Sequence, residues 1–295
     1  MRSITVALLV PALLSSAGLK IDHVTVAGPN IKDLQARLSA VGIASVYGGP
    51  HTNHATEMAL VSLPDGSYLE LMGIQSAADP QRVDQHEWSK FLKGDAGPCA
   101  WAVREPDIEA EVKRLTAAGI PVAAPVKSGR QRPDGVRLDW QTSDIGGVIR
   151  GTFFPFLIQD FTPRDQRAFP QGKPAIKDFT GVARVVIGVR NLEDAIKRYQ
   201  QAYNVPPPIK EVDKGLGIQL ALLGDLPVVL AQPLTANWLS ERIDRFGESP
   251  AAFILSARNG DRYATTSRSR WFGADIAWFD ENKLGWRLGY EKSRK

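Results

Sequence analysis

Cysteine is nearly absent from this chain, since Cys99 is the only one among 295 residues. One cysteine cannot build a disulfide framework within the chain, a cysteine-rich zinc site or a CxxC redox pair. An excess of charge of one sign is also lacking, because 36 Lys and Arg residues stand against 32 Asp and Glu, which leaves a net charge of +4. No basic run is interleaved with aromatic residues, so we expect no nucleic-acid partner.

A run of apolar residues long enough to cross a membrane is missing as well. Residues 4–14 are apolar apart from Thr5 and Pro11, and this run is too short to span a bilayer. It follows a positively charged start and precedes the small residues 15–17, which is the pattern of a secretory signal peptide. We therefore predict a signal peptide over residues 1–17, and a periplasmic or secreted protein with no membrane partner after cleavage. A buried N-terminal strand or a mis-assigned start codon are the alternatives.

What the chain does contain is enough apolar residues for a core, 43% of the total, arranged in an internal repeat. Residues 21–26 align without gaps on residues 182–187, and Asn30 then falls on Asn191. Another copy, second in chain order, places Asp107 at the position of Asn30. In each copy a strand-like run precedes a helix, so these three short polar residues are predicted helix N-caps.

Each predicted helix is followed by paired strands. Residues 58–63 and 68–72 are joined by Pro64-Asp65-Gly66, which predicts a hairpin with Asp-Gly at its tip. Comparable strand pairs follow the other two helices. A fourth, poorer copy runs through residues 251–255 and 274–290, where a helix is hard to see. The predicted repeat is β-α-β-β-β, present four times, and the predicted fold class is α+β.

These units resemble the glyoxalase-like domain of the vicinal oxygen chelate superfamily, which includes glyoxalases, bleomycin-resistance proteins and dioxygenases. The likeness rests on the opening Ile21-Asp22-His23-Val24, the hairpin segment 63–71, and the segment 128–135 followed by Trp140. It implies four βαβββ modules paired into two domains with curled mixed sheets. Residues 19–160 would form the glyoxalase-like domain with the site, and residues 178–295 a degenerate second pair. In this superfamily two paired modules enclose a cavity that usually holds a divalent metal and a small oxygen-rich molecule.

Two residues of the first module point to such a site. His23 lies in the middle of a strand, where taken alone it is typical of a core histidine satisfied by hydrogen bonds. Glu70 lies in an apolar strand with Tyr68 and Met72 on its own face, and a buried carboxylate is costly unless it is paired or bound to a cation. An exposed position on the outer face is the alternative for Glu70. The resemblance places His23 and Glu70 at the family's metal-ligand positions, so we expect both to line one pocket.

A third metal ligand is expected from His51 or His54, in the loop 48–54, although each is also compatible with an ordinary surface histidine. Together with His23 and Glu70, either would complete a set of two histidines and one carboxylate. Such a set can hold a divalent Zn, Mn, Ni or Fe ion with open positions.

The other modules lack these ligands. At the positions of His23 and Glu70 the second module has Ala100 and Pro155, and the third has Arg184 and Leu230. A symmetric cage of four ligands is therefore excluded.

All four histidines lie in the first third of the chain. Four-module extradiol dioxygenases carry iron in their C-terminal pair of modules, as that family's pattern implies, and this chain has no histidine there. We expect the C-terminal half to support the fold without chemistry of its own. We also expect no role for His86, which lies in the connector 85–88 outside any repeat strand.

Substrate contacts are predicted for Arg130, Arg132, Trp140 and Tyr68. The two arginines either solvate a hairpin tip or bind a carboxylate or phosphate, for which the planar fork of Arg130 is suited. Trp140 would supply an apolar wall, and Tyr68 shares its strand face with Glu70.

The predicted function is a metal-assisted lyase or isomerase that acts on a small carbonyl or carboxylate compound. Glu70 would ligate the metal or remove a proton next to a carbonyl. The alternative is a metal-free protein that sequesters a small ligand, as bleomycin-resistance proteins do, and a catalytically silent relative is a third hypothesis. The partner is in each case a small molecule, and a homodimer is compatible with the sequence.

Overall fold

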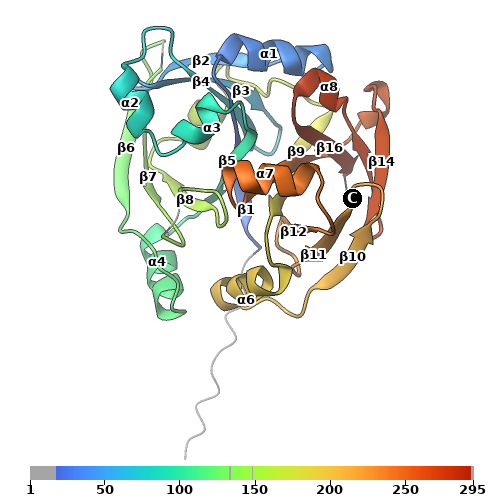
Figure 1. Cartoon of the computed structure of the whole chain (residues 1–295). Coiled ribbons are helices and arrows are strands. Elements are labelled where there is room, and N and C mark those ends of the chain that lie inside the picture. Colours follow the sequence, from blue (N-terminus) through green and yellow to red (C-terminus); the bar gives the residue numbers. More distant parts are fainter. Residues whose placement is uncertain (1–17, 133, 148, 294–295) are drawn as a thin grey trace, which may run out of the picture.

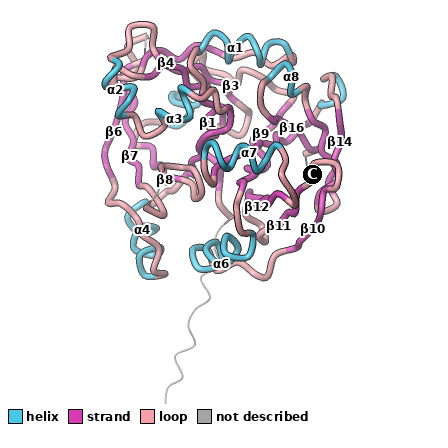
Figure 2. The backbone as a smooth tube through the Cα atoms, viewed as in Figure 1, coloured by secondary structure: helices cyan, strands magenta, loops and turns pink. Residues whose placement is uncertain are grey.

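The computed structural model describes residues 18–132, 134–147 and 149–293. The predicted signal peptide, residues 1–17, lies outside the described residues. None of the helices among the described residues has the length and apolar content that a membrane crossing requires. Figures 1 and 2 show two halves side by side, each built around a curled sheet.

The first half contains two modules that share one eight-stranded sheet, in the order β2-β3-β4-β1-β5-β8-β7-β6. The first module consists of β1 (Lys20–Ala27), α1 (Ile31–Ala40), β2 (Val46–Pro50), β3 (Thr56–Ser62) and β4 (Tyr68–Ile74). The second consists of β5 (Gly97–Arg104), α4 (Ile108–Ala117), β6 (Val126–Gln131), β7 (Arg137–Ser143) and β8 (Phe156–Asp160). Two short helices, α2 (Pro80–Gln85) and α3 (Ser89–Lys93), connect the modules, and α5 (Arg164–Ala168) follows them.

The second half repeats this arrangement, with the order β10-β11-β12-β9-β13-β16-β15-β14. Its first module consists of β9 (Phe179–Gly188), α6 (Leu192–Tyr203), β10 (Ile209–Asp213), β11 (Ile218–Leu222) and β12 (Val228–Pro233), and α7 (Trp238–Phe246) is its connector. The last module consists of β13 (Ser249–Ala257), the 3-10 turn η1 (Gly260–Arg262), β14 (Ser267–Trp271), β15 (Ala274–Trp278), α8 (Glu281–Leu284) and β16 (Arg287–Lys292). In this last module a single turn stands where the other modules have a helix, in agreement with the lack of a helical pattern in its sequence. The predicted α+β fold with paired βαβββ modules is confirmed.

The local signals read from the sequence account for where the repeated elements begin. The Asn30 side chain accepts hydrogen bonds from the first-turn amides of α1, and Asp107 and Asn191 do the same for α4 and α6. The predicted hairpin joins β3 to β4. Gly66 has a φ of +79° at its tip, where a left-handed backbone favours glycine, and Asp65 accepts a hydrogen bond from the Ser67 amide at 2.7 Å. The N-caps and the Asp-Gly turn are therefore confirmed.

Along the central strand of each sheet, side chains point alternately into a core that both halves share and toward the concave face of the sheet. Val24 and Val26 of β1 and Val185 and Ile187 of β9 belong to one buried hydrophobic cluster that both halves build together with the helices α1, α4 and α6. Side chains of a strand point alternately to its two faces. Consequently His23 and its alternate neighbours face the concave side of the first sheet.

The concave side of the second sheet is filled. Leu239 and Ile243 of α7 pack there against Val186 and other residues of the central strands. A buried ion pair between Arg184 Nε and Glu291 Oε2, 2.9 Å apart, occupies the position that matches His23 in the first sheet. The C-terminal half therefore contributes packing on the side where the first half has a cavity.

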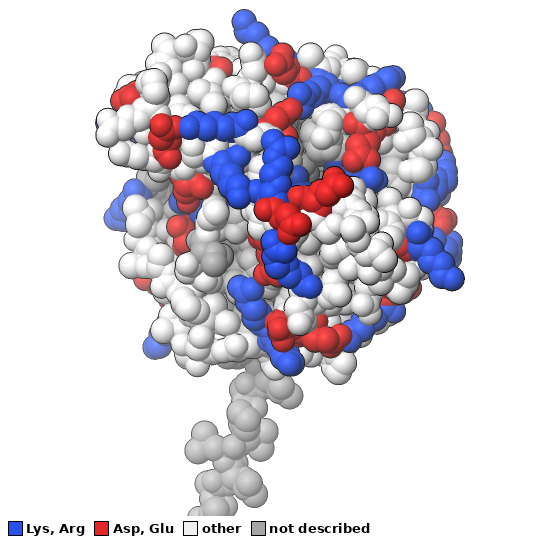
Figure 3. Space-filling view, in the orientation of Figure 1, with Lys and Arg blue, Asp and Glu red and all other residues white. Residues whose placement is uncertain are grey.

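Charges of both signs are interspersed on the face of the molecule drawn in Figure 3. This face does not present the continuous basic surface that is typical of nucleic-acid-binding proteins.

Candidate functional site

A cavity of about 440 Å³ opens on the concave face of the first sheet. All the residues that line it lie between His23 and Arg167, so both modules of the first half contribute and the C-terminal half does not. Apolar side chains from several strands, including Met58, Leu60 and Phe156, form part of its wall.

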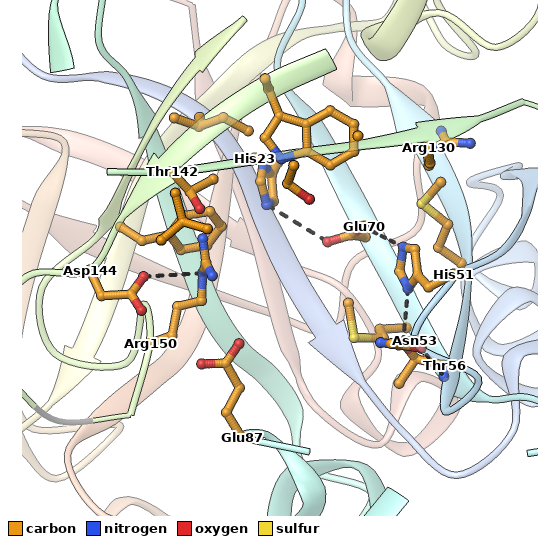
Figure 4. A pocket seen from close by; sticks show the side chains of 18 of the residues that line it. His23, His51, Asn53, Thr56, Glu70, Glu87, Arg130, Thr142, Asp144 and Arg150 are labelled. Carbon is orange, nitrogen blue, oxygen red and sulfur yellow. Dashed lines mark hydrogen bonds and ion pairs between the residues drawn. The ribbon is translucent and has the colours of Figure 1, made fainter. Parts of the chain in front are cut away.

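Glu70 lies between two histidines in the wall of this cavity (Figure 4). Its Oε2 atom is 3.7 Å from His23 Nε2, and its Oε1 atom is 3.8 Å from His51 Nε2. The Thr25 hydroxyl donates a hydrogen bond to Oε2 at 3.4 Å. His23 and Glu70 are 5% and 8% exposed, so the prediction that they share one pocket agrees with their placement.

Asp22 fixes the orientation of His23. Its Oδ1 atom is 2.6 Å from His23 Nδ1. Burial by itself raises the pKa of Asp22, but Arg167, the hydrogen bond from His23, and Arg164 together hold this pKa well below its usual value. The ionised Asp22 accepts a hydrogen bond from His23 Nδ1, which leaves Nε2 as the ring nitrogen that faces Glu70.

The two arginines around Asp22 come from α5, beyond the second module. Arg167 binds Asp22 Oδ2 at 2.8 Å and Asp160 Oδ1 at 2.5 Å, and it also donates to the Tyr68 hydroxyl at 2.6 Å. The Tyr68 ring in turn stacks on His23 with centroids 4.9 Å apart. The histidine is therefore held by a buried network that joins β4, β1 and the end of β8 to α5.

His51 is held in a comparable way at the end of β2. Its Nδ1 atom is 2.8 Å from the Thr56 hydroxyl oxygen, which also accepts a hydrogen bond from the Asn53 amide at 3.0 Å. Burial lowers the pKa of His51, while Glu70 acts in the opposite sense. A neutral imidazole with its proton on Nδ1 would present Nε2 to the carboxylate, as His23 does.

The other residues predicted for the site divide into two groups. Arg130, Trp140 and Tyr68 line the cavity together with His51. His54 does not line it and is exposed, with a positive φ of 56° in the loop before β3. Arg132 does not line it either, because it donates to the carbonyl oxygens of Gln166 and Pro170 at 2.8 and 2.6 Å.

The sequence analysis missed the far wall of the cavity. His86 and Glu87 of the connector line it, together with Asp144 and Arg150 (Figure 4). His86 therefore lies in the cavity wall although it belongs to no repeat strand, and whether it has a role there stays a prediction. Burial and the nearby His51 lower the pKa of His86 to about 4, and its Nδ1 accepts a hydrogen bond from the Trp88 amide at 3.1 Å. A connector has no repeat position, so alignment of the modules could not have placed these residues.

The strand register corrects two predicted equivalences. Glu70 pairs with Thr25 across β4 and β1. At the matching points the second module has Phe156 opposite Ala102, rather than Pro155, and the third has Val229 opposite Val186, rather than Leu230. Both predictions were one residue off because the connecting loops of the modules differ in length. Phe156 and Val229 are apolar, so neither can ligate a metal. The prediction that the second and third modules lack a ligand at the position of Glu70 therefore still holds with the corrected residues.

The side chains of His23, His51 and Glu70 are of the types that bind divalent metal ions. Two imidazoles with engaged Nδ1 atoms and one carboxylate form a set that binds Zn, Mn or Fe. The two separations run to different oxygens of Glu70, 3.7 Å from His23 Nε2 to Oε2 and 3.8 Å from His51 Nε2 to Oε1, so these side chains would have to shift to share one ion. In the part of the chain that the structure describes, no three His, Cys, Asp or Glu side chains are already gathered as a metal site.

Comparisons with known proteins agree with this architecture. A family model described as "Glyoxalase-like domain" matches residues 21–203, which is more than half of the chain and runs into the third module. No curated protein matches the sequence. Among solved structures, a hypothetical protein from Staphylococcus aureus is 16% identical with a TM-score of 0.63, and the match covers 93% of this chain and 99% of that chain. A triple mutant of 4-hydroxymandelate synthase from Streptomyces coelicolor is 12% identical with a TM-score of 0.60, and the match covers 94% of both chains. Identities this low show the fold alone, but the family model and the fold together identify the chain as a member of the glyoxalase-like domain family within the vicinal oxygen chelate superfamily.

Proposed function

We propose that this protein is a metal-assisted lyase or isomerase that acts on a small carbonyl or carboxylate compound in the cavity of the first sheet. The observation that carries the proposal is the position of Glu70, 3.7 and 3.8 Å from the Nε2 atoms of His23 and His51. A carboxylate at this depth with two converging imidazoles is typical of a catalytic site rather than of a packed core.

In this proposal Glu70 has two tasks, as a metal ligand and as a base, and the other residues have one task each. His23, His51 and Glu70 would hold a divalent Zn, Mn, Ni or Fe ion, which when bound supplies a Lewis acid that polarises a carbonyl oxygen. Glu70 removes a proton from the carbon next to the carbonyl and returns it, with the Thr25 hydroxyl orienting its Oε2 atom. Asp22 keeps the Nε2 lone pair of His23 directed at the site.

The second candidate function is a metal-free protein that binds and sequesters a small ligand. It is favoured by the mixture of apolar wall and positive charge in the cavity, because Met58, Leu60 and Trp140 line it together with the Arg130 guanidinium and none of these four is a metal donor. This alternative predicts ligand binding without metal and without turnover.

Calorimetric titration with Zn, Mn, Ni and Fe(II) separates the two functions. We expect one ion to bind per chain, and His23→Ala, His51→Ala and Glu70→Gln each to weaken it at least about tenfold. His54→Asn is the matched control, since His54 does not line the cavity and asparagine tolerates its positive φ. If the unmutated protein binds none of the four ions, the metalloenzyme proposal fails and the sequestration function remains.

A further inference from the structure

Arg130 is a buried cation without an anionic partner. It lies on β6, is 7% exposed and lines the cavity. Within the described part of the chain, its one hydrogen bond runs from Nη1 to the Gly48 carbonyl oxygen, at 3.2 Å. A guanidinium has five N–H donors, and burying it without an opposite charge is strongly unfavourable. Among the described residues, no carboxylate lies within ion-pair distance of it.

Two of the other cations that line the cavity are paired with carboxylates. Arg167 pairs with Asp22 and Asp160. The Nε atom of Arg150 is 3.3 Å from Asp144 Oδ1, and its guanidinium stacks on the Phe156 ring at 4.2 Å. Lys127 is exposed and lies over the Phe161 ring. Arg130 is therefore the buried cation of the cavity wall that has no ion pair with a carboxylate among the described residues, whereas Lys127 is solvated.

The neighbouring carboxylate of Glu70 attracts this charge electrostatically without pairing with it directly. Glu70 is directed at His23 and His51 and makes no ion pair with Arg130. One free guanidinium matches one negative charge, and its planar fork fits the two oxygens of a carboxylate. A phosphate ester carries nearly two charges at neutral pH and would need a second cation, and the only other described lining cation without a carboxylate partner, Lys127, is exposed to solvent.

Apolar residues lie beside Arg130. In the β6–β7 pair Arg130 is opposite Leu138 and Ser128 is opposite Trp140, so the side chains of Arg130 and Trp140 share one face of the hairpin. Met58 and Leu60 of β3 line the same cavity. A volume of about 440 Å³ accommodates a small acid with an apolar or aromatic body.

We propose that Arg130 binds the carboxylate of a monocarboxylic acid, with the apolar body of this acid against Trp140, Met58 and Leu60. The inference rests on the proposed function in one respect, since it takes the acid to be the substrate on which Glu70 acts. The binding step itself involves no metal ligand, so it can be measured separately.

The test is calorimetric titration of the full chain in EDTA with three probes of similar shape: phenylacetate, phenylacetamide and phenyl phosphate. We expect phenylacetate to bind at least tenfold more tightly than the neutral amide, and phenyl phosphate to bind no more tightly than phenylacetate. Arg130→Met should abolish the preference for the acid over the amide, and Arg130→Lys should retain part of it. Arg132→Met is the matched control, because Arg132 does not line the cavity and should leave the preference intact.

Three results would overturn the inference. They are equal affinity of the unmutated protein for the acid and the amide, tighter binding of phenyl phosphate than of phenylacetate, and an unchanged preference in Arg130→Met. The first two need no variant, so they decide the matter even if Arg130→Met fails to fold. Because EDTA removes metal, a failure here is distinct from a failure of the metal titration above.

Discussion

Asp22→Asn tests whether the buried network beneath the site is ionic. Asp22 is fully buried and binds Arg167 through both carboxylate oxygens, at 3.0 and 2.8 Å, as well as Arg164 and His23. Asparagine keeps the shape but removes the charge, which leaves Arg167 with Asp160 alone. Breaking a buried ion pair by removing one partner costs about 3–5 kcal/mol. We therefore expect the free energy of unfolding to fall by about this amount.

Urea denaturation monitored by circular dichroism measures this change, and the slope of the transition should stay the same. Asp244→Asn is the matched control, because its ion pair with Arg190 is exposed and should contribute about 0–1 kcal/mol. The pKa of Asp22 is held below its unfolded value of about 3.9, so its contribution is complete above about pH 4 and is lost as pH falls through the folded pKa. Equal stability of Asp22→Asn and the unmutated protein at pH 7 would refute the reasoning.

Three further predictions concern the connector, the second sheet and the N-terminus. The pKa of His86 is lowered to about 4, so the unfolded chain binds more protons than the folded one between about pH 6.5 and 4. As the pH falls through this window, the melting temperature of the unmutated protein should fall more steeply than that of His86→Asn, and equal slopes would contradict this. Glu291→Ala should lower the free energy of unfolding by about 3–5 kcal/mol, because it breaks the buried ion pair with Arg184. The affinity of the first sheet for phenylacetate should stay within twofold, and a large loss of affinity would show that the two halves are coupled. Protein recovered from its native host should begin near Gly18 by intact-mass measurement, in a periplasmic or secreted fraction, and a cytoplasmic pool that retains Met1 or Arg2 would argue against export.

The features of the fold that could be predicted are those with local causes. Asn30, Asp107 and Asn191 act through hydrogen bonds to amides two or three residues ahead, and the Asp-Gly turn depends on the backbone of Gly66. Such signals repeat with the modules, so alignment of the copies recovers them. The fourth copy has no helical pattern in its sequence at this position, which predicted the absence of the helix there.

The features of the site that could not be predicted depend on contacts between distant segments. Arg164 and Arg167 reach Asp22 from more than 140 positions away in the chain, and no spacing rule connects them. The same holds for the connector that brings His86 to the cavity, and for Arg132, which folds back onto Gln166 and Pro170. The strand period did predict that Glu70, Tyr68 and Met72 share one face, because that rule acts within a single strand.

Solvent hydrogen exchange tests most directly the central claim that Glu70 moves a proton in this cavity. The metal-loaded protein is incubated in D₂O with small 2-oxo acids, and loss of the proton signal next to the carbonyl is followed by NMR. With both proteins saturated with metal, we expect catalysed exchange with at least one of these acids by the unmutated protein, and a rate lowered at least about 100-fold in Glu70→Gln. Exchange at the same rate in Glu70→Gln, or none above the uncatalysed rate with any acid that binds, would contradict it.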